Sequence, residues 1–260
     1  IRAYDLTGVQ TCALPNYLAG FTDTVDFNYS IWKKNNVRAH KLSGYSIVNI
    51  SLTQLGTAPG DATSEQMRML ADLADKYSNS ELRTTKRQNL VFPYVRQNQV
   101  FELWQELAKN SLASPHQGTL AHVVACPGGD YCDLAKAVSI PIAQQVQQRF
   151  DDMDKLYDIG PININISGCE NSCAHHHISD IGLLGLKKNE QEFYQITLAG
   201  ETLHETAIGR KLGRSIAGAE VVDAIEDIVN IYLDSREEGE NFVDVFKRIG
   251  ITPFKEKVYG

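Results

Sequence analysis

Apolar and polar residues alternate or repeat at regular spacing along most of the chain, and this pattern predicts the order of the elements. Residues 45–52 (YSIVNISL) alternate between apolar and polar side chains, which is typical of a strand with one buried face. A helix is predicted next, because Thr63 or Ser64 can cap it and apolar residues then recur at helical spacing.

The pattern then changes period twice within a short stretch. A strand pair is predicted at 81–85 and 89–95, followed by a helix over about 99–110. Strand, helix, two strands and helix in this order indicate a ferredoxin-like half-domain over residues 39–112, preceded by an N-terminal segment at 1–38.

A second domain is predicted after residues 111–118, where proline and glycine mark a boundary. An apolar strand at 120–125 is followed by a helix over about 139–152, whose first turn suits the proline at its start. Residues 162–167 alternate strictly and predict another strand. Further strands at 181–186 and 194–198 and a late helix around 221–232 complete the pattern. Together these predict an α+β protein whose second part, residues 113–260, is an α/β domain.

Composition and charge narrow the class of protein. The 260 residues are 43% hydrophobic and 22% charged, as in ordinary globular proteins, and the net charge is −7. An acidic chain disfavours a nucleic-acid partner, and no apolar run of about eighteen residues suggests a membrane span. Without a secretory signal pattern, we expect a cytoplasmic protein whose thiols stay reduced.

One N-terminal stretch does not read as an evolved segment. Residues 7–15 (TGVQTCALP) look like a translated sequencing adapter, so we expect residues 1–15 to be artefactual and the natural sequence to start near Asn16. Cys12 is therefore given no role.

Four of the five cysteines form two close pairs. Cys126 and Cys132 enclose five residues, Cys169 and Cys173 enclose three, and each pair directly follows a predicted strand. Two adjacent strand ends can present four thiolates to one [4Fe–4S] cluster, and glycines beside the cysteines leave room for a bulky inorganic core. A helical Cys169–Cys173 segment would place both of its sulfurs on one face.

Other readings of the cysteines stay open on spacing alone. A structural zinc site, disulfides and unrelated buried thiols are the alternatives, although five enclosed residues are many for a zinc knuckle. Three consecutive histidines, 175–177, point in different directions on any regular backbone, so packing near the cofactors is favoured over a separate metal site.

The segment Ser167–Gly185 (SGCENSCAHHHISDIGLLG) resembles the sirohaem and [4Fe–4S] signature of the sulfite and nitrite reductase family. The earlier cysteine pair and residues 83–89 (RTTKRQN) resemble that family in the same order, and the resemblance covers about Ala39 to Lys255. The histidine run and residues 194–198 are most similar to the bacterial assimilatory sulfite reductase haemoprotein (beta) subunit.

The resemblance implies a set of roles. A [4Fe–4S] cluster is held by four thiolates, and the last cysteine also ligates the iron of sirohaem, so that electrons reach a haem on which sulfite becomes sulfide or nitrite becomes ammonia. The implied cluster ligands are Cys126, Cys132, Cys169 and Cys173, with Cys173 also catalytic. The implied cofactor contacts are Arg83, Thr85, Gln88, Asn89 and Asn171.

Cations are needed because sirohaem carries carboxylates and the substrate is an anion. Two groups are candidates, with a solvated surface cluster as the alternative for both: Arg83, Lys86 and Arg87, and Arg210, Lys211 and Arg214.

The chain departs from the family in length, since the family's polypeptide has two similar halves and this chain matches the second. The resemblance therefore implies a missing N-terminal half, a ferredoxin or flavoprotein electron donor, and poor sirohaem binding and slow turnover by this chain alone. A haem-free iron–sulfur electron-transfer module and a zinc-stabilised interaction domain are the competing functions.

Overall fold

The computed structural model describes residues 27–202 and 206–260, so the adapter-like stretch and Cys12 lie outside the described residues. The chain divides into two compact units that are not contiguous in sequence. The first unit contains the described residues up to Ile50, with Ser64–Thr84 and Leu90–Pro115. The second contains Ser51–Thr63, Thr85–Asn89 and His116–Gly260.

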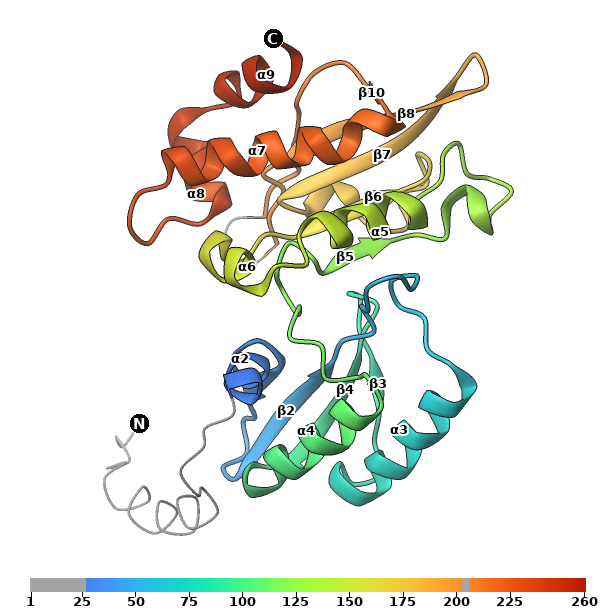
Figure 1. The fold of residues 1–260 in the computed structure, drawn as a ribbon, viewed down its shortest axis with the longest axis vertical. Coiled ribbons are helices and arrows are strands. Elements are labelled where there is room, and N and C mark those ends of the chain that lie inside the picture. Colours follow the sequence, from blue (N-terminus) through green and yellow to red (C-terminus); the bar gives the residue numbers. More distant parts are fainter. Residues whose placement is uncertain (1–26, 203–205) are drawn as a thin grey trace. The chain divides into compact units, whose positions relative to one another are not determined.

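In the first unit, the described strands form an antiparallel sheet in the order β1–β2–β4–β3 (Figure 1). Its strands are β1 (Val37–Ala39), β2 (Tyr45–Ile50), β3 (Arg83–Thr84) and β4 (Leu90–Arg96). Every second residue of β2 is buried, as the alternation predicts. The helices are α2 (Phe27–Asn36), α3 (Ser64–Tyr77) and α4 (Val100–Lys109), with a short 3-10 turn, η1 (Gln97–Gln99).

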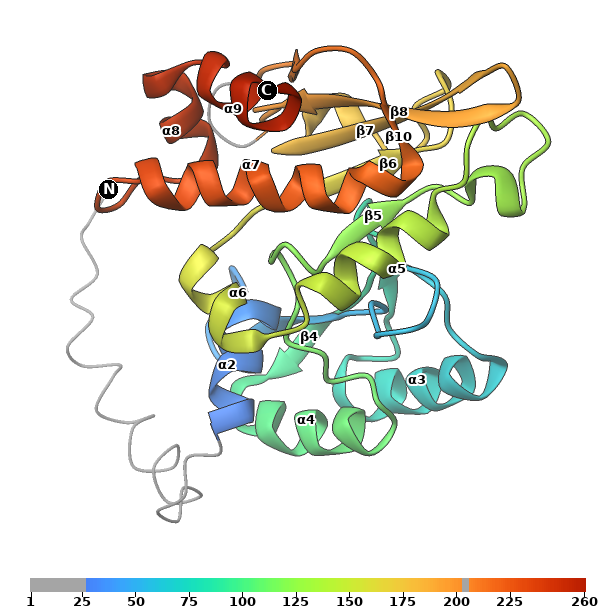
Figure 2. The ribbon, with the colours of Figure 1, turned by 45° about the horizontal axis from the view of Figure 1, so that its top comes forward.

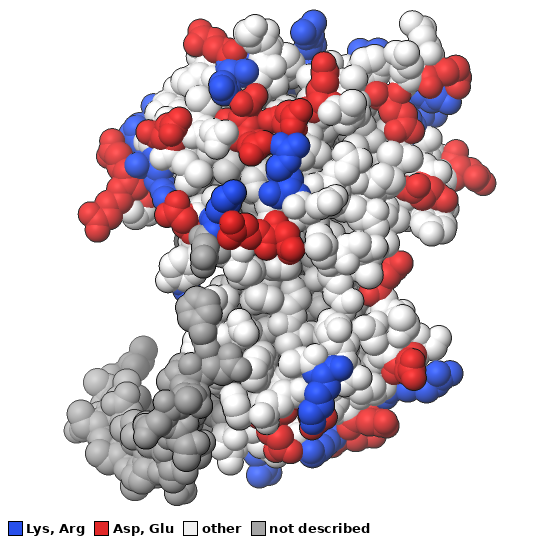
Figure 3. Space-filling view, in the orientation of Figure 1, with Lys and Arg blue, Asp and Glu red and all other residues white. Residues whose placement is uncertain are grey.

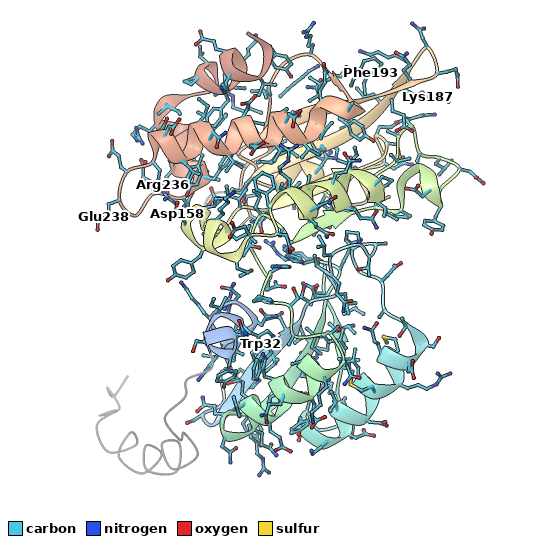
Figure 4. All side chains as sticks on the ribbon, viewed as in Figure 1. Trp32, Asp158, Lys187, Phe193, Arg236 and Glu238 are labelled. Carbon is cyan, nitrogen blue, oxygen red and sulfur yellow. The ribbon has the colours of Figure 1, made fainter. Side chains whose placement is uncertain are left out.

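The helix α2 was not predicted, and its aromatic side chains hold it in place. Trp32, labelled in Figure 4, is fully buried. The centre of the Tyr29 ring lies 5.3 Å from that of the Trp104 ring of α4. Its polar and apolar residues lack a clear helical period, so burial of these aromatic rings rather than amphipathicity explains the helix.

In the second unit, the described strands form a mixed sheet in the order β10–β8–β7–β6–β5, with β9 paired to β8. The strands are β5 (Val123–Ala125), β6 (Ile164–Ser167), β7 (Ile181–Lys188), β8 (Gln191–Leu198), β9 (Arg210–Lys211) and β10 (Ile216–Ala217). The pairs β5–β6 and β6–β7 are parallel, whereas β7 and β8 form an antiparallel hairpin. Parallel strands run in the same direction, so the carboxyl ends of β5 and β6 lie at the same end of the sheet.

Helices α5 and α7 lie side by side on one face of this sheet (Figures 1 and 2). The helices of this unit are α5 (Ile140–Arg149), α6 (Met153–Ile159), α7 (Val221–Ser235), α8 (Phe242–Ile249) and α9 (Thr252–Tyr259). Short 3-10 turns are η2 (Gly128–Asp130), η3 (His176–Ile178) and η4 (Gly218–Glu220). The core between sheet and helices includes Ile164, Ile181, Ile196, Val146 and Ile225. Burial of these side chains from the apolar faces is the main force that holds the sheet and helices together.

The single helix expected over 139–152 is wrong in its C-terminal part. α5 ends at Arg149 and a separate helix, α6, begins at Met153. The Asp152 carboxylate accepts a hydrogen bond from the Lys155 backbone N–H, so this aspartate starts a new helix instead of ending the previous one. The Arg236 guanidinium, at the end of α7, then donates to the Asp158 and Ile159 carbonyls (Figure 4).

Other expected elements are found with small shifts at their ends. The strand expected at 120–125 is shorter than expected, because β5 begins only at Val123. In contrast, β7 and β8 are each longer than the ranges expected. Helices α8 and α9 and the short strands β1, β9 and β10 were missed. The start of α8 carried a usable signal, because the Asn241 side chain accepts from the backbone N–H groups of Val243 and Asp244.

In the part of the chain that the structure describes, no helix combines the length and apolar character needed to cross a membrane. On the face shown in Figure 3, acidic and basic side chains are interspersed instead of forming a field of one sign.

Candidate metal centre

The two cysteine pairs leave the sheet at neighbouring strand ends. Cys126 directly follows β5, and Cys169 follows β6 after one glycine. The strands are parallel, with Ala125 opposite Ile166, and the Cys126 backbone N–H donates to the Ile166 carbonyl at 3.0 Å. Both pairs therefore start from the same edge of the sheet.

The loops that carry the two pairs are also in direct contact. The backbone N–H of Gly168 donates a hydrogen bond to the Cys126 sulfur at 3.1 Å. The Gly168 carbonyl in turn accepts from the backbone N–H groups of Lys136 and Ala137, at 2.8 and 3.1 Å. Both the N–H and the carbonyl of Gly168, in the second cysteine loop, are thus hydrogen-bonded to the first cysteine loop.

The glycines beside the cysteines are required by this packing. A Cβ added to Gly168 would lie 2.7 Å from the Ala137 carbonyl oxygen, and one added to Gly128 would lie 2.5 Å from the Ser139 nitrogen. Gly128 also has a φ of +62°, which favours glycine. Packing within and between the two loops is thus a reason for glycine at both positions, and the expectation that these glycines leave room for an inorganic core stays a prediction.

The four cysteines differ in exposure. Cys126 and Cys169 are buried, Cys132 is half-buried and Cys173 is exposed, and each carries a free thiol. The disulfide alternative is therefore not realised. Cys126 packs with Val124 and Ala174 in a small apolar cluster. The first cysteine of each pair is therefore buried, whereas the second is at least partly accessible to solvent.

The segment from Cys169 to Cys173 is a pair of turns, so the helical arrangement considered for it is not found. Ser172 has a φ of +57°, its N–H donates to the Cys169 carbonyl at 3.2 Å, and its hydroxyl lies 2.9 Å from His177 Nε2. A left-handed residue in the middle of the segment breaks the helical repeat. Asn171 is exposed on the same turn.

The three histidines lie in different environments. His175 and His177 are exposed, while His176 is buried, with its ring centroid 3.9 Å from that of His177. Within residues 27–202 and 206–260, no three Cys, His, Asp or Glu side chains converge as they would to chelate a single ion.

The donor set fits an iron–sulfur cluster. Four free thiols come from two loops in contact at one sheet edge, and thiolate is the ligand that [4Fe–4S] clusters take from proteins. The N–H from Gly168 to the Cys126 sulfur is also of the kind that tunes such clusters, since hydrogen bonds to ligand sulfurs shift the reduction potential.

Residues predicted as further cofactor contacts are placed in two different units. Arg83 belongs to the first unit, where its guanidinium is paired with the Glu81 carboxylate. Thr85, Gln88 and Asn89 belong to the second unit. The Thr85 hydroxyl accepts from the backbone N–H groups of Arg87 and Asn89, at 3.2 and 3.3 Å.

The two amide side chains of this loop are also engaged by the protein. The Gln88 amide pairs with the backbone of Ala125, the residue before Cys126. The Asn89 carbonyl oxygen accepts from the Leu52 N–H at 3.1 Å, and its NH₂ group donates to the Gln117 side chain at 2.5 Å. Direct contact of these residues with a cofactor stays a prediction.

A polar network beside this loop was missed by sequence reasoning. The Arg87 guanidinium donates to the Asn163 side-chain oxygen, and Asn163 donates through its backbone N–H and NH₂ group to the Asp180 carboxylate, at 2.7 and 2.8 Å. Burial raises the pKa of Asp180 and lowers that of Arg87. Arg87 is thus bound within the protein. The strict alternation around Asn163 was the signal for a strand, and nothing local pointed to its partners.

A buried histidine completes this network. The His122 Nε2 lies 3.3 Å from the Arg87 carbonyl oxygen and 3.0 Å from the Asn89 nitrogen. Burial, and next the charge of Arg87, lower the pKa of His122 to about 4, so the ring is neutral near neutral pH.

The second group of cations, Arg210, Lys211 and Arg214, lies on or just after the short strand β9, which pairs with β8, and all three residues are exposed. Arg210 and Lys211 form β9, and the Arg210 guanidinium lies 6.0 Å from the Phe246 ring centre. The Arg214 guanidinium lies 5.8 Å from the Tyr259 ring centre. These cations rest on aromatic rings at the surface, and a cofactor role for them stays a prediction.

The α+β fold and the four free thiols near one end of its sheet define the class of domain to which this part of the chain can be compared. Comparison with known families agrees. Residues 118–260 match the nitrite and sulphite reductase 4Fe-4S domain, and residues 51–110 match the nitrite/sulfite reductase ferredoxin-like half domain. The chain belongs to the nitrite and sulfite reductase family. The expectations of an α+β fold and of this family, whose cofactors are a [4Fe–4S] cluster and sirohaem, are confirmed.

Some relatives of this chain are named as sulfite reductases and others as nitrite reductases. Sulfite reductase [ferredoxin] 2 of Mycolicibacterium paratuberculosis is 30% identical over 203 residues, covering 74% of this chain and 36% of that protein. Ferredoxin–nitrite reductase of Synechococcus elongatus is 28% identical over 210 residues, covering 76% and 39%. The chain therefore spans well under half the length of these relatives.

Solved structures agree with the fold. The Mycobacterium tuberculosis NirA protein superposes with a TM-score of 0.64 at 26% identity, covering 84% of this chain and 41% of that one. Dissimilatory sulfite reductase I gives a TM-score of 0.65 at 15% identity, over 82% of this chain and 69% of that one, which shows a shared fold.

Proposed function

We propose that this chain is the C-terminal half of an assimilatory sulfite reductase, in which Cys126, Cys132, Cys169 and Cys173 hold a [4Fe–4S] cluster. The observation that carries the proposal is the hydrogen bond from Gly168 to the Cys126 sulfur, which joins the two cysteine loops at one sheet edge. The family match over 118–260 supports the same reading.

In this proposal, Cys173 has a second role as the shared ligand of cluster and sirohaem. Its exposure supports that role, because a thiolate that serves a second metal must be reachable from outside the cysteine loops. When bound, the cluster and sirohaem supply single-electron transfer and a haem iron that takes the substrate oxyanion. In the same proposal, the exposed Asn171 side chain would donate hydrogen bonds to the cluster or the haem edge.

The reaction we propose is the six-electron reduction of sulfite to sulfide, with reduction of nitrite to ammonia as the alternative. Relatives named for each substrate support both, and those named sulfite reductase [ferredoxin] support sulfite and a ferredoxin donor. Since the chain spans 36% of the first of these relatives, we also propose that a missing N-terminal half supplies further cations around substrate and sirohaem. We place the protein in the cytoplasm, where its four free thiols would stay reduced.

The test is anaerobic reconstitution of the full chain with iron and sulfide, followed by iron, sulfide and zinc assays. We expect about four irons and four sulfides per chain, as a [4Fe–4S] cluster contains. Replacing any of the four cysteines by serine should lower this content sharply, whereas Cys12→Ser should not. A colourless chain that binds one zinc would contradict the proposal.

Sirohaem and substrate are tested separately. A brown chain whose spectrum does not change when sirohaem is added would favour the haem-free electron-transfer module. The choice between sulfite and nitrite is made by comparing kcat/KM for the two anions in the complete enzyme with reduced ferredoxin.

A further inference from the structure

The strand that leads into Cys126 is an end strand of its sheet. Among the described strands, β5 has β6 as its neighbour on one side. The Cys126 N–H bonds to Ile166 of β6, and alternate residues of a parallel strand turn their backbone groups to opposite sides. The N–H and carbonyl of Ala125 accordingly face away from β6, at the open edge.

The side chain of Gln88 occupies that edge. Its NH₂ group donates to the Ala125 carbonyl at 2.6 Å, and its carbonyl oxygen accepts from the Ala125 N–H at 3.0 Å. A primary amide offers a donor and an acceptor in one plane, as a backbone peptide does. Gln88 therefore takes the place of one residue of a further strand.

The loop that presents this amide is itself fixed within the second unit. The Thr85 hydroxyl accepts from backbone N–H groups on both sides of Gln88. The Arg87 guanidinium is bound by Asn163, the residue just before β6. A Cβ on Gly60 would lie 3.0 Å from the Gln88 Cβ, so this side chain is also closely packed.

The backbone of Gln88 is held in a conformation that favours glycine, with a φ of +57°. A residue other than glycine is held there at a conformational cost, which contacts of its side chain can offset. The two hydrogen bonds to Ala125 are such contacts.

We propose that Gln88 is a positioning residue for the iron–sulfur cluster: its amide clamps Ala125 and so fixes the end of β5 from which the Cys126 ligand projects. This inference rests on the function proposed above. Gln88 acts through the backbone and needs no contact with the cluster. Without the clamp, the end of β5 opens more often, and the Cys126 sulfur leaves its place opposite Gly168 more often.

Two variants separate positioning from folding. Gln88→Met keeps the length of the side chain but removes both hydrogen bonds, and Gln88→Gly removes the side chain while relieving the positive φ. Gln144→Met is the matched control, because the Gln144 amide also donates to a backbone carbonyl of the same unit, that of Gly56 at 3.4 Å, in a hydrogen bond that does not involve Ala125.

The first readout needs no cluster. Hydrogen exchange of the Ala125 amide, followed by NMR in the apo chain, should be about tenfold faster in both Gln88 variants, because the hydrogen bond that protects this amide is lost. It should be unchanged in Gln144→Met. Equal Ala125 exchange in parent and Gln88 variants would overturn the clamp.

The second readout is the rate at which the reconstituted chain loses iron to a chelator. We expect about tenfold faster loss in both Gln88 variants, in the range typical of residues that orient metal ligands. Faster loss in Gln88→Gly without a lower unfolding midpoint of its apo chain would distinguish positioning from general destabilisation. Iron loss at the parent rate would overturn the inference. A parent chain that takes up no iron would instead defeat the proposed function, and Ala125 exchange would still test the clamp.

Discussion

The backbone N–H of Gly168 donates a hydrogen bond to the sulfur of Cys126, 3.1 Å away. This contact joins the second cysteine loop to the first cysteine itself, although 42 positions separate the two residues. It depends on the absence of a side chain at Gly168, where a Cβ would meet the Ala137 carbonyl oxygen at 2.7 Å.

Gly168→Ala should therefore push the two cysteine loops apart. We expect a loss of about 2 kcal/mol in the free energy of unfolding of the apo chain, as for other overpacked sites, and weaker retention of iron after reconstitution. Urea unfolding and iron assays measure both. Gly129→Ala is the matched control, because a Cβ there meets its nearest atoms at 3.5 Å, an ordinary contact. Equal effects of the two substitutions would contradict the packing argument.

The exposure of the four thiols predicts the order in which the apo chain is alkylated. Cys173 should react first with iodoacetamide and Cys132 next, while buried Cys126 and Cys169 react last, because reagent must reach the sulfur. Mass spectrometry of peptides at successive times gives the order. After reconstitution all four should be protected together, and continued fast labelling of Cys173 would show that it is not a cluster ligand.

Buried His122 predicts a loss of stability in acid. Its pKa is lowered to about 4 in the folded chain, against about 6.5 when unfolded. Between these values the unfolded chain binds a proton that the folded chain does not, so the free energy of unfolding falls as the pH drops from 6.5 to 4, by up to about 3 kcal/mol. His122→Asn should flatten this part of the profile.

Urea unfolding of the apo chain at pH 7 and pH 4.5 measures the effect of His122. The contributions of His176, whose pKa is also about 4, and of Asp180 are present in both proteins and cancel in the difference. Parallel profiles for parent and His122→Asn would exclude this role for His122.

Arg87 should matter for stability more than its neighbour in the same basic segment. Arg87→Met leaves Asn163 without its donor and the Asp180 carboxylate without its nearby positive charge. We expect a loss of about 2 kcal/mol in the free energy of unfolding, within the range for a broken buried charged hydrogen bond. Lys86→Met, one residue away, should change it by less than about 0.5 kcal/mol. The pKa of Asp180, followed by NMR, should rise further in Arg87→Met.

Much of the second unit could be predicted because its signals are local. The alternation before Cys169, the apolar run before Cys126 and the stripe around Ile225 each identify an element, and the parallel pairing of β5 and β6 brings the two cysteine loops together. The domain boundaries drawn from the sequence stay a proposal. Those boundaries divide the sequence into continuous stretches, whereas the second compact unit also contains residues 51–63 and 85–89, which lie between segments of the first.

What could not be predicted depends on contacts between distant positions. Gln88 and Ala125 are 37 positions apart, and nothing in the spacing of either indicates a side-chain amide paired with a strand edge. Likewise, glycine is required at position 168 because any Cβ there would clash with the Ala137 carbonyl oxygen, which belongs to the other cysteine loop. α2 was missed because its burial rests on aromatic packing against α4 and not on a helical period.

The second unit borrows residues 51–63 and 85–89 from the part of the sequence that otherwise builds the first. A truncated protein beginning at His116 would keep all four cysteines and the entire match to the 4Fe-4S domain, yet lose Gln88. Its β5 would then offer bare backbone groups to the β5 of another molecule, and unprotected edges of this kind promote aggregation. A piece that keeps the second unit whole must therefore include residues 51–63 and 85–89, and no single cut in the sequence separates the two units.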